Sequence, residues 1–152
     1  MLYTTYFAYL RHIKDGDNVI PISIAAKPPV WWTGLKYEKL APSYECLMKY
    51  KKDGNTKDYV QRYCKETLGE LNPIDVACDF LRLIPSDKQK LVDMVNCPLW
   101  ENPYVHIALV CYEKPEDFCH RHIDRAWFNE SNIRCNELLP NNRKSYEVDL
   151  SD

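Results

Sequence analysis

A chain of 152 residues is long enough to form one domain with a buried core. Hydrophobic residues make up 45% and charged residues 28%, the balance of a soluble globular protein, and no apolar run approaches the ~18 residues that span a bilayer. With a net charge of −2, the chain lacks the basic composition of a protein that binds duplex nucleic acid. We therefore expect a single domain over residues 1–152 that does not engage membranes.

The seven cysteines indicate a reducing environment. Their number is odd, no two have the C-x-x-C spacing of zinc ribbons, and the sequence begins without a secretory signal. We predict that most are reduced and packed as small hydrophobic residues in a cytoplasmic protein. Eleven Tyr and four Trp residues supply many rings, either for core packing or for a pocket that takes a flat ligand.

Two strands are predicted in the N-terminal part of the chain. Residues 2–9 are rich in β-branched and aromatic side chains, and residues 19–26 form an apolar run typical of a strand covered on both faces. Residues 27–37 contain two prolines, a glycine and adjacent Trp31 and Trp32, which predicts an irregular loop. These two tryptophans either line a pocket or cover the edge of the core.

Three helices follow, over residues 40–50, 57–71 and 73–84. Pro42 lies near the first turn of the first helix, where its missing N–H costs nothing, and Thr56 and Asn72 can cap the other two. Residues 85–103 are polar with proline at both ends and can hold a short helix near residues 88–95. The length of this segment predicts an inserted lobe or a lid.

The last third of the chain carries the clearest pattern. Residues 106–111 predict a buried central strand, and residues 116–129 predict a helix that begins just after Pro115. In the C-terminal tail, a short last strand is expected at residues 146–148.

Strands separated by helices predict an α/β fold: a three-layer, Rossmann-like domain with a small, mainly parallel sheet flanked by helices. Such sheets bind ligands in the crevice beyond the carboxyl ends of their strands. Residues 5–9, 25–32 and 111–121 should meet there. Neither G-x-G-x-x-G nor the P-loop pattern occurs, and the chain has only four glycines, so both phosphate-binding motifs are excluded.

Cys119 is the candidate nucleophile. In the first turn of the predicted helix, the helix N-terminus and the neighbouring His120 and Arg121 would stabilise its thiolate. The alternative is that Cys119, next to Phe118, is a buried packing residue.

Metal binding is a second interpretation of the same stretch. Donor atoms are available from Cys111, Cys119, His120 and His122, with Glu113 nearby. However, the C-x7-C-H spacing matches no standard zinc module, and successive residues of a helix point in different directions. We therefore predict neither a metal nor a cofactor.

Ligand recognition without covalent chemistry is the third interpretation. Arg121 and the N–H groups of the helix start would hold an anion, and Glu113 would accept hydrogen bonds from a ribose or a base. The other predicted ligand-binding residues are Cys111, Tyr6, Ser23, Trp31 and Trp32. The alternative for Arg121 and Glu113 is a buried ion pair that fixes the loop.

Several motifs occur together in one order: Y-T-T-Y-F at residues 3–7, I-S-I at 22–24 followed by P-P and Trp31, K-L-A-P at 39–42, and C-Y-E-K-P-E-D-F-C-H-R-H at 111–122. This set resembles the domain of unknown function 488 family, bacterial and viral proteins with a strand ending in Cys-x-Glu and a helix beginning Cys-His-Arg. The resemblance covers most of the chain, with residues 85–103 as a local insertion. It implies a compact α/β domain and a shared cluster of Cys111, Glu113, Cys119, His120 and Arg121, but no particular reaction.

We expect, therefore, a protein that binds a nucleotide-like or other anionic small ligand at the carboxyl edge of the sheet, with or without acting on it enzymatically. The candidate catalytic residues are Cys119, His120 and Glu113. The alternative is a non-catalytic interaction protein, such as a small viral or mobile-element protein that engages a host protein. An exposed pair of Trp31 and Trp32 and a well-ordered insertion at residues 85–103 would support this alternative.

Overall fold

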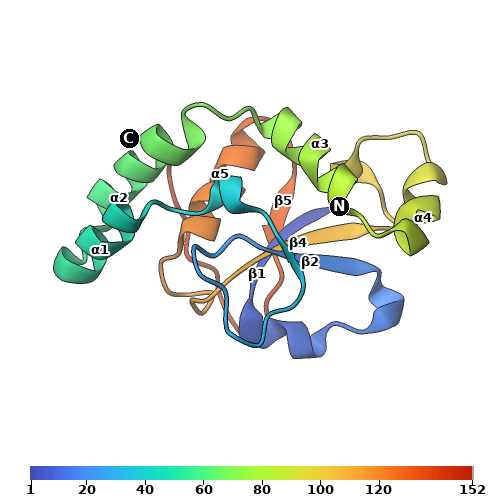
Figure 1. The fold of residues 1–152 in the computed structure, drawn as a ribbon, viewed down its shortest axis with the longest axis horizontal. Coiled ribbons are helices and arrows are strands. Elements are labelled where there is room, and N and C mark those ends of the chain that lie inside the picture. The colour runs from blue at the N-terminus through green and yellow to red at the C-terminus, as the bar shows by residue number, and fades with distance from the viewer. Residues whose placement is uncertain (152) are drawn as a thin grey trace.

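The computed structural model describes residues 1–151 and contains one five-stranded, all-parallel sheet in the order β3-β2-β4-β1-β5 (Figure 1). The strands are β1 (Leu2–Tyr6), β2 (Val19–Ser23), β3 (Leu35–Lys36), β4 (His106–Cys111) and β5 (Cys135–Glu137). The α-helices are α1 (Tyr44–Asp53), α2 (Thr56–Tyr63), α3 (Pro73–Leu83), α4 (Gln89–Asp93) and α5 (His120–Glu130). Short 3-10 turns and one π turn (Cys64–Leu68) connect them. The predicted three-layer α/β fold with a parallel sheet flanked by helices is confirmed.

Strand β4 is the centre of the sheet. Its apolar run is covered on both faces and pairs with β1 on one side and β2 on the other. The register sets Tyr6 opposite Cys111 and Ser23 opposite Val110. The carboxyl ends of three strands therefore lie level at one edge, where the loops after β1, β2 and β4 emerge.

The core lies between this sheet and the helices drawn above and to the left of it in Figure 1, which are α1, α2, α3 and α5. Ile22, Leu109, Ile123 and Phe128 have no exposed surface. Burying side chains of this size stabilises the fold by about 1.5–3 kcal/mol each. Within residues 1–151, no helix combines the length and apolarity that a membrane crossing requires.

Two predicted strands are shorter than expected. The segment 2–9 leaves the sheet at Tyr6, because a 3-10 turn begins at Phe7. The segment 19–26 ends at Ser23, whose hydroxyl accepts a hydrogen bond from the backbone N–H of Ala25 at 3.3 Å and turns the chain away.

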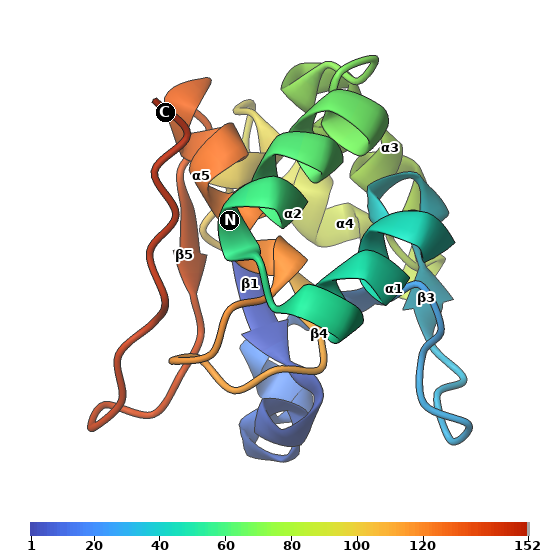
Figure 2. The ribbon, with the colours of Figure 1, turned by 90° about the vertical axis from the view of Figure 1, so that its left-hand side faces the viewer.

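The prediction of a last strand at residues 146–148 is wrong. The fifth strand is Cys135–Glu137, which pairs with β1. The chain then turns back (Figure 2), and Arg125 of α5 holds the returning segment through hydrogen bonds to Ser145 and to the Tyr146 carbonyl. The sequence of this strand is Cys-Asn-Glu, which is too short and too polar to show the alternation of apolar residues that identifies a strand.

The predicted start of the last long helix is also wrong by four residues. Pro115 begins no helix but occupies the second position of a turn closed by the hydrogen bond from Asp117 N–H to Lys114 O, a position that proline favours. Cys119 has an extended backbone (φ −151°, ψ 151°) and is the N-cap residue of α5. Cys119 therefore precedes the first turn of the helix instead of lying within it.

The segment 85–103 lies at the amino ends of the strands. The N-terminal amine of Met1 donates hydrogen bonds to the carbonyls of Asn102 and Val105, and the Asn102 side chain binds the Leu91 carbonyl of α4. Leu99 is buried in the core. Whether the segment is an insertion or a lid stays a prediction. It lies at the opposite end of the strands from the carboxyl edge, where the loops after β1, β2 and β4 emerge.

Candidate functional site

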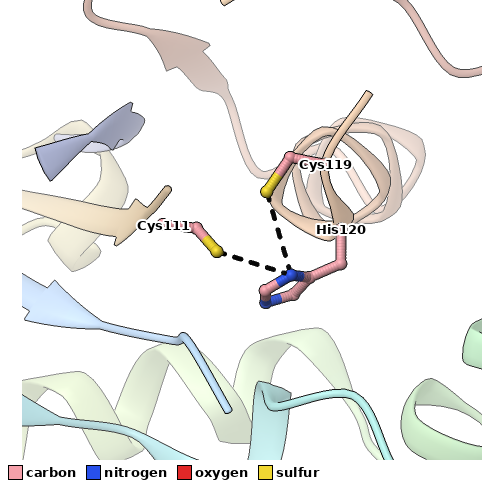
Figure 3. A group of neighbouring side chains, drawn as sticks. All are labelled: Cys111, Cys119 and His120. Atoms are coloured by element: carbon pink, nitrogen blue, oxygen red, sulfur yellow. Dashed lines mark hydrogen bonds between the residues drawn. The ribbon is translucent and has the colours of Figure 1, made fainter. Parts of the chain in front are cut away.

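A cluster of Cys111, Cys119 and His120 lies where β4 ends and α5 begins (Figure 3). Cys111 is the last residue of β4, Cys119 caps α5, and His120 is the first helical residue. The His120 Nδ1 atom is 3.7 Å from Cys111 Sγ and 3.9 Å from Cys119 Sγ. All three side chains are buried, so their mutual contacts replace water.

The orientation of the His120 ring is fixed by the loop that follows β2. Its Nε2 atom lies 2.9 Å from the carbonyl oxygen of Ile24, and its ring packs against the Tyr63 ring at 5.5 Å between centroids. Because a carbonyl only accepts, Nε2 carries a proton and donates it. Nδ1 therefore faces the two sulfur atoms.

The cluster stabilises a thiolate on Cys119. Burial alone would raise the pKa of this thiol, but hydrogen bonds from Cys111 and His120 and the positive charges of His120 and Arg121 hold the pKa well below its ordinary value. The hydrogen bond to Cys119, together with burial, raises the pKa of Cys111. Burial disfavours a charged His120, yet the adjacent thiolate and Asp124 raise its pKa. The thiolate form of Cys119 and the charged form of His120 therefore favour each other.

Asp124 is a functional candidate that sequence reasoning missed. It is fully buried one turn after His120, and its carboxylate accepts a 2.8 Å hydrogen bond from the Tyr63 hydroxyl. Burial raises the pKa of Asp124 to about 7, opposed by the charge of His120. The i, i+4 spacing from His120 to Asp124 places both on one helix face and could have identified it.

A pocket of about 470 Å³ opens over the cluster. Its lining combines the three cluster residues with rings and charged groups from α1, α2 and the loops after β2 and β4, in particular Tyr50, Tyr59, Tyr112, Phe118, Lys27, Lys51 and Glu113. The Phe118 ring packs edge to face on Tyr59, at 5.2 Å between centroids, and lies tilted against Tyr50 at 5.5 Å. Helix α1, to which the sequence analysis assigned no functional residue, thus forms one wall.

Glu113 lines this pocket and is not paired with Arg121, whose partner is Glu137. Its side chain is partly exposed, and desolvation together with the negative charge of Cys119 raises its pKa. The Tyr112 hydroxyl donates to the Lys27 carbonyl and joins the two loops that form the rim.

Arg121 points away from the pocket into the core, where its partner is Glu137 of β5. Its Nε atom donates to Glu137 Oε1 at 2.8 Å and its Nη2 atom to Oε2 at 3.3 Å, and neither side chain is accessible to solvent. Its third nitrogen, Nη1, has no hydrogen-bond partner within residues 1–151. The structure does not place Arg121 where it can contact a ligand in the pocket, although its charge acts on Cys119.

The remaining predicted residues lie apart from the cluster. His122 donates from Nε2 to Glu137 at 3.0 Å. The Arg121 guanidinium lies over the Tyr6 ring, 5.8 Å from its centroid. Ser23 is buried, and its hydroxyl accepts a hydrogen bond from the Ala25 N–H. Of the two tryptophans, Trp32 packs on the core edge and donates to the Leu35 carbonyl, whereas Trp31 is 63% exposed. None of these five side chains is among the pocket-lining residues of the described chain.

Comparison with known proteins assigns the family. No curated protein and no solved structure shows a significant match to the chain. A family model described as the active DUF488-N3 subclade matches residues 29–132, more than half of the sequence and the whole of the cluster. The chain belongs to the DUF488 family, as its motifs indicated.

Proposed function

We propose that this protein binds a nucleotide-like or other anionic small molecule in the pocket over Cys119 and acts on it with Cys119 as the nucleophile. The observation that carries the proposal is the position of Cys119, beside His120 and Cys111, in the lining of a pocket that also contains several rings. Both features occur at the carboxyl edge of a parallel sheet, where ligands of α/β proteins usually bind.

The chemistry of the lining favours a flat, negatively charged ligand. Tyr50, Tyr59 and Phe118 offer ring faces and edges for stacking. Lys27 and Lys51 supply the positive charge for a phosphate or carboxylate, the part that the sequence had assigned to Arg121. Glu113 can accept from a hydroxyl or an exocyclic amine.

The cluster supplies a nucleophile and an acid. The Cys119 thiolate would form a bond to an electrophilic carbon of the ligand, while the leaving group departs with the electron pair and takes the Nδ1 proton of His120. Neutral His120 could then take a proton from the water that releases the covalent intermediate. The matched family model is described as an active subclade, which favours a reaction over binding alone.

A thermal-shift screen with nucleoside monophosphates and sugar phosphates tests the binding step. At about 100 times the dissociation constant, a ligand stabilises the native state by about 2.7 kcal/mol. We expect at least one compound to raise the melting temperature of the wild type, and Lys51→Ala to reduce this shift because the anion loses a cationic partner.

Lys52→Ala is the matched control, since Lys52 is an exposed neighbour in α1 that does not line the pocket. It should keep the full ligand-induced shift. Equal shifts in the two lysine variants, or no shift with any compound, would contradict the proposal.

The non-catalytic interaction protein remains the second candidate because Trp31 is 63% exposed beside a fully exposed Val30. The same screen separates the two functions. A protein that uses only this surface gives no ligand-induced shift. If a shift occurs, Trp31→Ser should leave it unchanged, because Trp31 does not line the pocket.

A further inference from the structure

We propose that Cys111, Cys119 and His120 bind a zinc ion whose fourth coordination position is open to the pocket. The sequence spacing argued against a metal site, because the donors belong to no known zinc module. The fold nevertheless brings three of the four candidate donors together, since the end of β4 and the start of α5 meet at one edge of the sheet.

The distances from His120 Nδ1 to the two sulfur atoms are close to those between the ligands of tetrahedral zinc. With Zn–S bonds of about 2.3 Å and Zn–N bonds of about 2.0 Å, ligand atoms lie roughly 3.5–3.8 Å from one another. The two Sγ–Nδ1 distances are 3.7 and 3.9 Å, and all three donor atoms lie within 4.8 Å of one another.

The second ring nitrogen of His120 supports the same assignment. Metal-binding histidines almost always donate their other N–H to a carbonyl or carboxylate, which fixes the tautomer. His120 Nε2 makes this bond to the Ile24 carbonyl and leaves Nδ1 directed at the sulfurs. The fourth candidate, His122, is not part of the cluster, because the donor atoms that lie together are those of Cys111, Cys119 and His120 alone, and the His122 side chain contacts Glu137 instead.

The donor set selects a thiophilic metal over magnesium or calcium. Two thiolates and one imidazole suit zinc, and their two negative charges balance a divalent ion in a buried site. Three protein ligands with one open position are typical of catalytic zinc sites, whereas structural sites are closed by four. All three donors line the pocket together with Glu113, so the open position would face a bound ligand.

This inference goes beyond the proposed function, because a metal on Cys119 Sγ occupies the atom that the covalent mechanism uses. The zinc-loaded and metal-free forms would therefore differ in chemistry. Zinc binding should block alkylation of Cys119 without preventing small molecules from entering the rest of the pocket.

Metal titration of the reduced, metal-free full chain tests the site. We expect one Co²⁺ per chain with thiolate-to-cobalt charge-transfer bands and the intense visible bands of tetrahedral cobalt, displaced by one Zn²⁺. Loss of residues that only support a metal ligand costs about 10–100-fold in affinity, so removing a ligand should cost at least about 100-fold. Competition with a chromophoric chelator measures this loss in Cys111→Ser, Cys119→Ser and His120→Asn.

Cys97→Ser is the matched control, because Cys97 is a partly exposed cysteine outside the cluster and should not affect zinc binding. Melting curves without metal establish that each variant is folded. Substoichiometric binding, or unchanged affinity in two folded cluster variants, would overturn the site. The two proposals are tested separately. If the protein does not bind zinc, a ligand can still raise its melting temperature, and if no ligand raises the melting temperature, the protein can still bind zinc.

Discussion

Replacement of Glu137 by Gln will lower the free energy of unfolding by about 3–5 kcal/mol, the usual cost of breaking a buried ion pair from one side. The Glu137 carboxylate accepts hydrogen bonds from Arg121 at 2.8 and 3.3 Å and from His122 at 3.0 Å. Two hydroxyl groups, those of Thr4 and Ser145, donate to it at 2.8 and 3.0 Å. A neutral amide leaves the Arg121 charge without a counterion in the core.

The same carboxylate makes stability fall in acid. Burial opposes the charged form of Glu137, but His122 and Arg121 outweigh it and hold its pKa well below the ordinary value of 4.5. A group whose pKa is lower in the folded state stabilises the protein above its unfolded pKa. This stabilisation is lost progressively as the pH falls below about 4.5 toward the folded pKa.

Urea denaturation at neutral pH, and again at several acidic pH values, measures both effects. The wild type should lose stability below about pH 4.5 more steeply than Glu137→Gln, which has already lost the carboxylate. Glu116→Gln is the control, since the Glu116–Arg143 pair is exposed to water and should matter far less. Equal losses in the two variants would show that the buried network does not stabilise the fold.

The sequence predicts the framework well because its signals are local. The run of five apolar residues that follows His106 identifies the central strand at its true bounds, and Asn72 before Pro73 identifies the start of α3. The motif that ends β4 and precedes α5 likewise predicted where a pocket would lie. Strand β5 has no such signal, because two of its three residues, Asn136 and Glu137, are polar. Only its pairing with β1 defines it.

The role of Arg121 could not be predicted for the same reason. An arginine near the start of a helix is compatible with an anion-binding site and with a buried ion pair. Which of the two it forms depends on whether its side chain points to a pocket or to a carboxylate in the core. Its partner, Glu137, belongs to the unrecognised strand. Conversely, His120 joins Cys111 and Cys119 only because the chain folds back between them, so the spacing of the motif did not reveal the shared geometry.

In the reduced, metal-free protein, Cys119 should be alkylated by iodoacetamide with a pH midpoint well below about 8.5, the value of an unperturbed thiol. The hydrogen bonds and charges that lower its pKa keep the thiolate populated at neutral pH, and reactivity should fall only as the pH drops through the lowered pKa. Although Cys119 is only 5% exposed, it lines the pocket, which gives a small reagent a route to its sulfur. Peptide mapping by mass spectrometry after timed exposure measures the rate at each cysteine.

Substitutions in the cluster separate a nucleophile from a packing residue. Cys119→Ser should abolish alkylation at position 119 and any turnover. His120→Asn should raise the pH midpoint of Cys119 alkylation toward that of an ordinary thiol, because the positive charge of His120 is lost. Cys64 provides an internal reference in the same sample, since desolvation raises its pKa and should make it react slowly at neutral pH. A Cys119 that titrates near 8.5, or that reacts no faster than Cys64 at neutral pH, is a buried packing residue. The pocket would then have a binding role without covalent chemistry.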